Sequence, residues 1–125
     1  MYKKKILFLT GTRADYGKLK PLINVVKLEK RFSPIILATG MHMLKKYGNT
    51  YIEIIKDFKN VKLYKFFNQK KNDSMDMVLS NTIKKFNFYL RKIKPDLVVV
   101  HGDRIETLAV SIYCNLHNIL LVHVE

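Results

Sequence analysis

Short apolar segments alternate with longer segments of helical periodicity along this 125-residue chain, and this alternation limits the fold more than any other feature. An uninterrupted apolar run ended by glycine or a polar cluster is typical of a buried strand. Apolar residues that recur every three or four positions are typical of a helix with one buried face. Because the two patterns alternate, we expect a parallel sheet with helices on both faces, which is a Rossmann-like α/β domain.

Five segments have the character of strands: Lys4–Gly11, Ser33–Gly40, Asn60–Phe66, Asp96–Val100 and Asn118–Glu125. Four helical patterns lie between them, and their spaced apolar residues are Tyr16 to Val26, Leu44 to Phe58 (with Tyr47 and Tyr51), Met75 to Ile93 and Ile105 to Leu116. We expect the second of these helices to be interrupted or to start late around Gly48. Asp15 is a candidate N-cap for the first helix, and Pro95 ends the third. The parallel arrangement places the loops that follow the strands at one edge of the sheet.

Composition indicates one globular domain, since 48% of the residues are hydrophobic and 26% are charged. The first apolar run meets Gly11, Arg13 and Asp15 too early for a signal peptide, and no run approaches the length of a membrane span. The one cysteine, Cys114, provides neither a disulfide nor a metal framework. We therefore expect a cytoplasmic protein without a membrane partner.

The net charge of +13 raises the question of a nucleic-acid partner. Only four of the 23 basic residues are arginines, and the lysines are spread along the chain. Proteins that read phosphates and bases favour the planar fork of arginine. We interpret the lysines as a solvated surface and expect no nucleic-acid partner; a steep salt-dependent affinity for generic DNA would reverse this interpretation.

The loop "GTRADYG" joins the first strand to the first helix, and such glycine-rich loops let backbone N–H groups approach an anion. It lacks the spacing of the dinucleotide fingerprint and of the P-loop. Arg13 and Lys18 would place two cations beside a phosphate or a sugar oxygen. The alternative is a tight turn with two surface cations, and the spacing does not separate the two readings.

Two carboxylates, Asp103 and Glu125, each follow an apolar strand and a histidine. Carboxylates held close together at neighbouring strand ends can have pKa values that are pushed apart, so that one removes a proton while the other holds one. The alternative for Asp103 is that it caps the helix that begins near Ile105.

Four blocks carry a resemblance to a known family: "LFLTGTRADYGKLKPLI", "ATGMHMLKKYGNTYIEI", "DLVVVHGDRIETLA" and "LVHVE". In this order and spacing they resemble the hydrolysing UDP-N-acetylglucosamine 2-epimerases of bacterial sialic and legionaminic acid synthesis. The resemblance runs from about Lys4 to Glu125. The first block is similar to the branch with G-T-R-A-D-Y, and differs from the G-T-R-P-E of the non-hydrolysing branch.

The resemblance implies the N-terminal half of a two-domain GT-B-type enzyme, with the active site between two Rossmann-like domains. Such enzymes eliminate UDP from UDP-GlcNAc to give 2-acetamidoglucal, then add water to release N-acetylmannosamine. No cofactor or metal is implied, and the full-length family members form homo-oligomers. The implied catalytic residues are Asp103 and Glu125. The implied substrate-binding residues are Gly11, Thr12, Arg13, Lys18, His42 and Arg104.

The chain departs from the family pattern after "HVE", where family members continue with glycines, further acidic residues and a second domain that supplies a catalytic histidine. We expect the 125 residues alone to be inactive, and we expect His101 and His123 to satisfy backbone groups at strand ends, with His117 at an exposed helix end. Two alternatives stay open: a UDP-N,N'-diacetylbacillosamine 2-epimerase, and a sugar-nucleotide-binding module without turnover. A signalling receiver domain is excluded because no acidic cluster follows the first strand.

Overall fold

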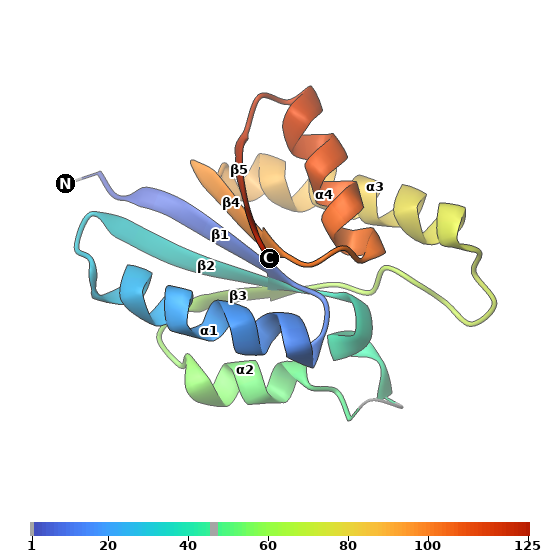
Figure 1. The fold of residues 1–125 in the computed structure, drawn as a ribbon, viewed down its shortest axis with the longest axis horizontal. Coiled ribbons are helices and arrows are strands. Elements are labelled where there is room, and N and C mark those ends of the chain that lie inside the picture. The colour runs from blue at the N-terminus through green and yellow to red at the C-terminus, as the bar shows by residue number, and fades with distance from the viewer. Residues whose placement is uncertain (1, 46–47) are drawn as a thin grey trace.

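The structure is a computed structural model that describes residues 2–45 and 48–125. Strands and helices alternate along it as expected (Figure 1). The strands are β1 (Lys4–Thr10), β2 (Phe32–Ala38), β3 (Lys62–Lys65), β4 (Leu97–His101) and β5 (Leu120–Val124). The helices are α1 (Arg13–Leu28), the 3₁₀ helix η1 (Gly40–Met43), α2 (Tyr51–Asp57), α3 (Met75–Ile93) and α4 (Ile105–Leu116).

All five strands are parallel and lie in the order β3-β2-β1-β4-β5. The chain moves outward in one direction from β1 to β3, then crosses back to the other side of β1 to form β4 and β5. The strand order therefore reverses between β1 and β4. Ligands of open α/β sheets bind at such a reversal, outside the carboxyl ends of the strands.

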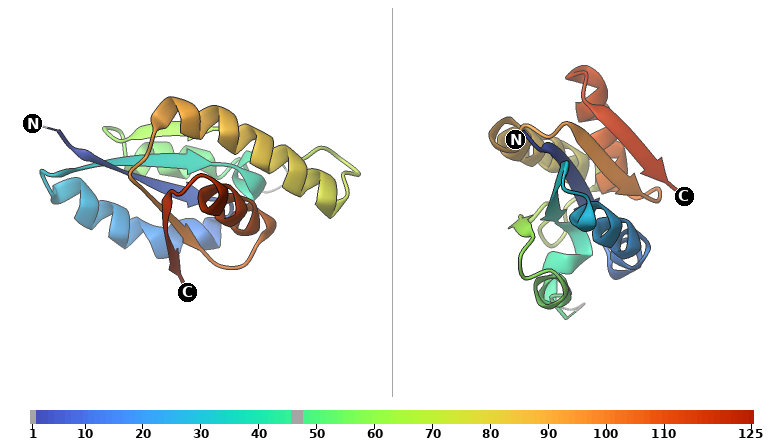
Figure 2. Two further views of the ribbon diagram at one scale, coloured as in Figure 1. Left: turned by 90° about the horizontal axis from the view of Figure 1, so that it is seen from above. Right: turned by 90° about the vertical axis from the view of Figure 1, so that its left-hand side faces the viewer.

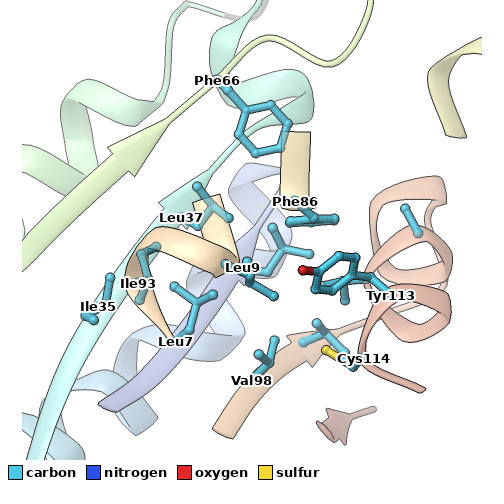
Figure 3. Close-up of a cluster of buried hydrophobic side chains, with 14 residues drawn as sticks. Leu7, Leu9, Ile35, Leu37, Phe66, Phe86, Ile93, Val98, Tyr113 and Cys114 are labelled. Atoms are coloured by element: carbon cyan, nitrogen blue, oxygen red, sulfur yellow. The ribbon is translucent and has the colours of Figure 1, made fainter. Parts of the chain in front are cut away.

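Each face of the sheet is covered by its own pair of helices (Figure 2). Successive strand residues point to opposite faces, so Leu7 and Leu9 pack beneath α3 and α4 while Ile6 and Phe8 pack beneath α1 and α2. Figure 3 shows the first of these two clusters, in which Phe86 joins Leu7 and Leu9. Complete burial of one such side chain stabilises the fold by about 1.5–3 kcal/mol. Burial on both faces explains why the strands are continuous apolar runs.

The second helical pattern was expected to be interrupted or to start late around Gly48, and the structure confirms a late start. Leu44 lies at the C-terminal end of η1, the helix α2 begins only at Tyr51, and Tyr47 lies outside the described residues. Gly48 and Asn49 have φ values of 82° and 47°, which are incompatible with a right-handed helix. Left-handed backbone at these two positions therefore prevents one continuous helix.

The strand predicted at Asn60–Phe66 is shorter in the structure, where β3 covers Lys62–Lys65. Before it, the backbone N–H of Val61 donates to the carbonyl of Phe58, so the chain is still in a turn there. No helix in the described residues is long and apolar enough to cross a membrane.

Candidate functional site

The loops after β1, β2, β4 and β5 lie at one edge of the sheet, as predicted, because the strands are parallel and in register. Thr10 pairs with Ala38, and His101 pairs with Val124, so neighbouring strands end at the same level. We call this edge the strand-end rim. It is formed by residues 11–13, 39–42, 102–104 and 125.

Helix α1 begins directly after the short loop that follows β1, so its N-terminus lies at this rim. Thr12 is the N-cap of α1, and its hydroxyl accepts the backbone N–H of Asp15 at 3.1 Å. The prediction that Asp15 is the N-cap is therefore wrong: a threonine three residues earlier reaches the same helix terminus first. Gly11 is buried, and a Cβ there would lie 3.4 Å from the carboxyl carbon of Glu106, so the loop lies tightly against α4.

The two cations predicted for this loop are both exposed. Arg13 Nε lies 3.3 Å from Glu53 Oε2 of α2, and 74% of the Arg13 side chain is exposed. An ion pair this exposed contributes little stability, so Arg13 can exchange Glu53 for an anionic ligand at small cost. Lys18 lies in the second turn of α1 and is exposed. The structure thus places both cations at the rim or beside it.

Asp103 and Glu125 follow two neighbouring strands at the rim. The backbone N–H of Gly102 donates to the carbonyl of Val124 at 3.2 Å, which joins the two chain segments just before the carboxylates. Both Asp103 and Glu125 are exposed. Asp103 and Glu125 are therefore each the next residue after a hydrogen bond that joins their two chain segments.

The capping alternative for Asp103 is wrong. The N-cap position of α4 is Arg104, whose side chain makes no capping hydrogen bond. Within the part of the chain that the structure describes, the Asp103 carboxylate has no hydrogen-bond or ion-pair partner. Arg104 is also exposed at the rim. Among the described residues, neither the Asp103 nor the Arg104 side chain makes a hydrogen bond or an ion pair that would explain its presence.

His42 is fully buried and makes only internal contacts. Its Nε2 lies 2.7 Å from Thr10 Oγ1, and its Nδ1 lies 2.6 Å from Thr50 Oγ1. Thr10 donates its one hydroxyl hydrogen to the carbonyl of Thr12, so Nε2–H donates to Thr10 and Nδ1 accepts from Thr50. Burial lowers the pKa of His42 to about 4, in keeping with a neutral ring. His42 thus holds the loops after β1 and β2 together through these two hydrogen bonds, and its expected role in substrate binding stays a prediction.

The expectations for the other three histidines are confirmed for His123 and His117 and wrong for His101. His123 Nε2 donates to the carbonyl of Gly102 at 2.6 Å, so it satisfies a backbone group as expected. His101 instead bonds a side chain: its Nδ1 lies 2.9 Å from Asp15 Oδ1. His117 is exposed at the end of α4, where its ring stacks on Tyr113. The partner of His101 is 86 positions away, and only the fold brings the two together.

A buried polar group beneath the loops was missed in the sequence. Glu106 is 4% exposed, and its Oε1 accepts from the amide of Asn68 at 3.4 Å. Asn68 also donates to Thr82 Oγ1 at 3.1 Å. A Cβ on Gly40 would collide with Glu106 Oε1, so glycine is required where the loop after β2 meets α4. Glu106 lies in the sequence motif around Asp103, but nothing in the sequence distinguishes it from an exposed residue in the first turn of a helix.

The fold and the residues at the strand-end rim together define a class of protein. It is a doubly wound parallel α/β domain with a glycine-rich strand-to-helix loop, and the exposed carboxylate of Asp103 follows β4 at the point of strand reversal. A sequence profile of the UDP-N-acetylglucosamine 2-epimerase family matches residues 25–125. The chain belongs to this family.

Two relatives and one solved structure illustrate the match. The chain is 42% identical over 122 residues to the UDP-N-acetylglucosamine 2-epimerase of Neisseria meningitidis serogroup B, covering 98% of this chain and 32% of that protein. It is 36% identical over 124 residues to the GDP/UDP-N,N'-diacetylbacillosamine 2-epimerase (hydrolyzing) of Campylobacter jejuni, with the same coverages. The crystal structure of UDP-GlcNAc 2-epimerase from Neisseria meningitidis bound to UDP-GlcNAc superposes with a TM-score of 0.82 at 27% identity, over 97% of this chain and 31% of that one. The chain spans about a third of the length of the curated relatives it matches.

Proposed function

We propose that this chain is the N-terminal domain of a hydrolysing UDP-N-acetylglucosamine 2-epimerase, in which a second domain faces the strand-end rim in the GT-B manner. Family membership and the relative bound to UDP-GlcNAc support a UDP-sugar substrate. The observation that carries the proposal is the placement of Asp103 and Glu125. They follow two registered strands, and no contact among the described residues accounts for Asp103.

The proposed reaction has two steps. A carboxylate removes the proton from C2 of the sugar, the C1–C2 double bond forms, and the C1–O bond breaks with its electrons passing to UDP. Water then adds across the double bond of 2-acetamidoglucal, with oxygen bonding C1 and a proton returning to C2 from the opposite face. The products are N-acetylmannosamine and UDP. Two carboxylates suit this sequence because one proton must leave and another must arrive.

The departing diphosphate requires compensation for its growing negative charge. Arg13, Lys18 and Arg104 provide cations, and the N-terminus of α1 provides free backbone N–H groups. Gly11 and Thr12 let the backbone of the loop approach the ligand closely. We propose that these residues bind the phosphates and that His42 holds their loop in place.

Substitution of the carboxylates tests this assignment. In the full reading frame that contains this domain, Asp103→Asn and Glu125→Gln should each reduce UDP release from UDP-GlcNAc by about 10²–10⁴-fold. The matched control is Glu29→Gln, which removes a half-buried carboxylate, paired with Arg31, at the end of α1 remote from the rim. Thermal unfolding should be unchanged in Asp103→Asn, because that exposed side chain makes no hydrogen bond or ion pair with the residues that the structure describes. Retained UDP release in both rim variants would refute the proposal.

Two other functions are tested alongside the proposed one. The Campylobacter jejuni relative is named for a diacetylbacillosamine substrate, so the same variants should be assayed with UDP-N,N'-diacetylbacillosamine. The other candidate is a sugar-nucleotide-binding module without turnover. Calorimetry of the 125 residues with UDP-GlcNAc separates the last case: tight binding supports a module, whereas an incomplete enzyme binds weakly.

A further inference from the structure

The hydrogen bond between Asp15 and His101 takes no part in the chemistry proposed above. It ties the first turn of α1 to the last residue of β4, where the strand order reverses. The side chains are 10% exposed for Asp15 and 16% exposed for His101. Water therefore competes little for the bond, while His101 keeps an accessible edge.

The contacts of Asp15 determine which ring nitrogen of His101 carries hydrogen. Asp15 Oδ2 accepts the backbone N–H of Gly11 at 3.3 Å, so both carboxylate oxygens act as acceptors. An acceptor at Nδ1 requires Nδ1 to be the donor. Nε2 is then the nitrogen left to bond outward, and within residues 2–45 and 48–125 no protein group bonds it. A buried carboxylate behind a histidine is a known means of orienting the ring for catalysis.

The loops on either side pack closely around this pair. Gly102 follows His101 with a φ of 82°, and a Cβ on Gly102 would lie 3.4 Å from Asp15 Oδ1. The pair thus lies between the Gly11–Arg13 loop and the loop that carries Asp103. These are the two loops that the proposed function assigns to the phosphates and to proton transfer.

We propose that His101, positioned by Asp15, donates a hydrogen bond from Nε2–H to the diphosphate as it leaves the sugar. This inference rests on the proposed function. The electrons of the C1–O bond pass to the departing oxygen, and the Nε2–H group opposes the charge that collects there. With Nδ1–H bonded to Asp15, Nε2 donates in the form of the ring that carries hydrogen on both nitrogens. No proton has to be transferred.

The tautomer is tested on the 125-residue chain by ¹⁵N NMR of the imidazole rings. At a pH where the ring is neutral, wild-type His101 should carry its hydrogen on Nδ1. In Asp15→Asn the amide can donate to Nδ1, and the hydrogen should move to Nε2. An Nε2–H tautomer in the wild type, or no change in Asp15→Asn, would overturn the proposed pairing of Asp15 with His101 (the dyad), whatever the activity of the protein.

Kinetics in the full reading frame test the role of Nε2. His101→Asn keeps a donor at the Nδ1 position facing Asp15 but removes Nε2, and should lower kcat for UDP release by about 10²–10³-fold with a smaller change in KM. His101→Gln places an amide near the Nε2 position and should recover part of this loss. His117→Asn, at the exposed helix end, is the matched control and should match the wild type.

A purely structural role predicts the opposite order, with His101→Asn as active as the wild type and His101→Gln impaired. That result would overturn the inference while the proposed function stands, provided that Asp103→Asn is inactive. If the wild type releases no UDP, the proposed function fails. The dyad then fails as well if UDP titrated into the 125-residue chain leaves the Nε2 resonance of His101 unmoved, and it survives as a phosphate contact if that resonance shifts.

Discussion

At the scale of single residues, the histidines of this chain differ by what surrounds them. His42 is enclosed between two threonine hydroxyls, and burial holds its pKa near 4. His101 faces a carboxylate, and His123 faces a backbone carbonyl. The same side chain is therefore a neutral brace in one place and a candidate hydrogen-bond donor to substrate in another.

The buried ring of His42 should make folding sensitive to acid. In the unfolded chain His42 becomes protonated below its ordinary pKa of 6.5, whereas in the folded chain it stays neutral down to about pH 4. The free energy of unfolding therefore falls as the pH decreases from 6.5 to about 4. Between about pH 7 and pH 5 the loss from this one group is about 2 kcal/mol. Urea unfolding at each pH should therefore show a shallower acid loss in His42→Gln than in the wild type.

His117→Gln is the matched control for this measurement, because His117 is exposed. Its unfolding free energy should follow the wild-type pH dependence. Equal acid sensitivity in His42→Gln and the wild type would show that the buried ring is not the cause.

At the scale of elements, most strands and helices could be predicted from the sequence because their periodicity is local. The long helix α3 covers Met75–Ile93, and α4 covers Ile105–Leu116, as the apolar spacing indicates. The late start of α2 was indicated by Gly48, whereas the left-handed backbone at Asn49 was not predicted, because the spacing of apolar residues does not report it. A backbone conformation at one or two residues can override a helical pattern.

Local patterns in the sequence likewise predict only part of the candidate site. The rim carboxylate Asp103 follows a recognisable strand, so parallel topology alone places it. The contact between Asp15 and His101 joins segments 86 positions apart, and the burial of Glu106 depends on two loops from elsewhere in the chain. Such pairings arise only after the sheet forms.

The turn between β2 and η1 should be the most demanding connection at this scale. Gly40 has a φ of 63°, and a Cβ there would lie 2.7 Å from the carbonyl oxygen of Gly11 and collide with Glu106. The strained backbone and the overpacking together should make Gly40→Ala destabilising by about 2–4 kcal/mol in urea unfolding.

The matched substitution is Gly17→Ala within α1, where a Cβ meets nothing within 4 Å. It should stabilise the chain by about 0.5–1 kcal/mol, because alanine is the better helix former. If both variants unfolded at the same denaturant concentration, the close approach of the loops at Gly40 would be disproved.

At the scale of the whole molecule, the strand order brings the loops after β1 and β4 to the centre of one edge, although about 90 residues separate them in the chain. The net charge of +13 is a second property of the whole chain. Its lysines also line a hollow of about 390 Å³ between α3 and the loop before it, formed in part by Lys70, Lys84 and Lys85. This hollow and the rim are therefore two cationic surfaces for an anionic ligand, and they lie on different elements.

The measurement that separates these sites is ¹⁵N chemical-shift mapping of the 125-residue chain titrated with UDP-GlcNAc. The rim account predicts weak binding with the largest backbone shifts at Gly11, Thr12, Gly102 and Asp103, and small shifts along α3. Largest shifts at Lys84 and Lys85, or an unchanged spectrum at saturating ligand, would contradict the claim that the ends of the parallel strands form the sugar-nucleotide site.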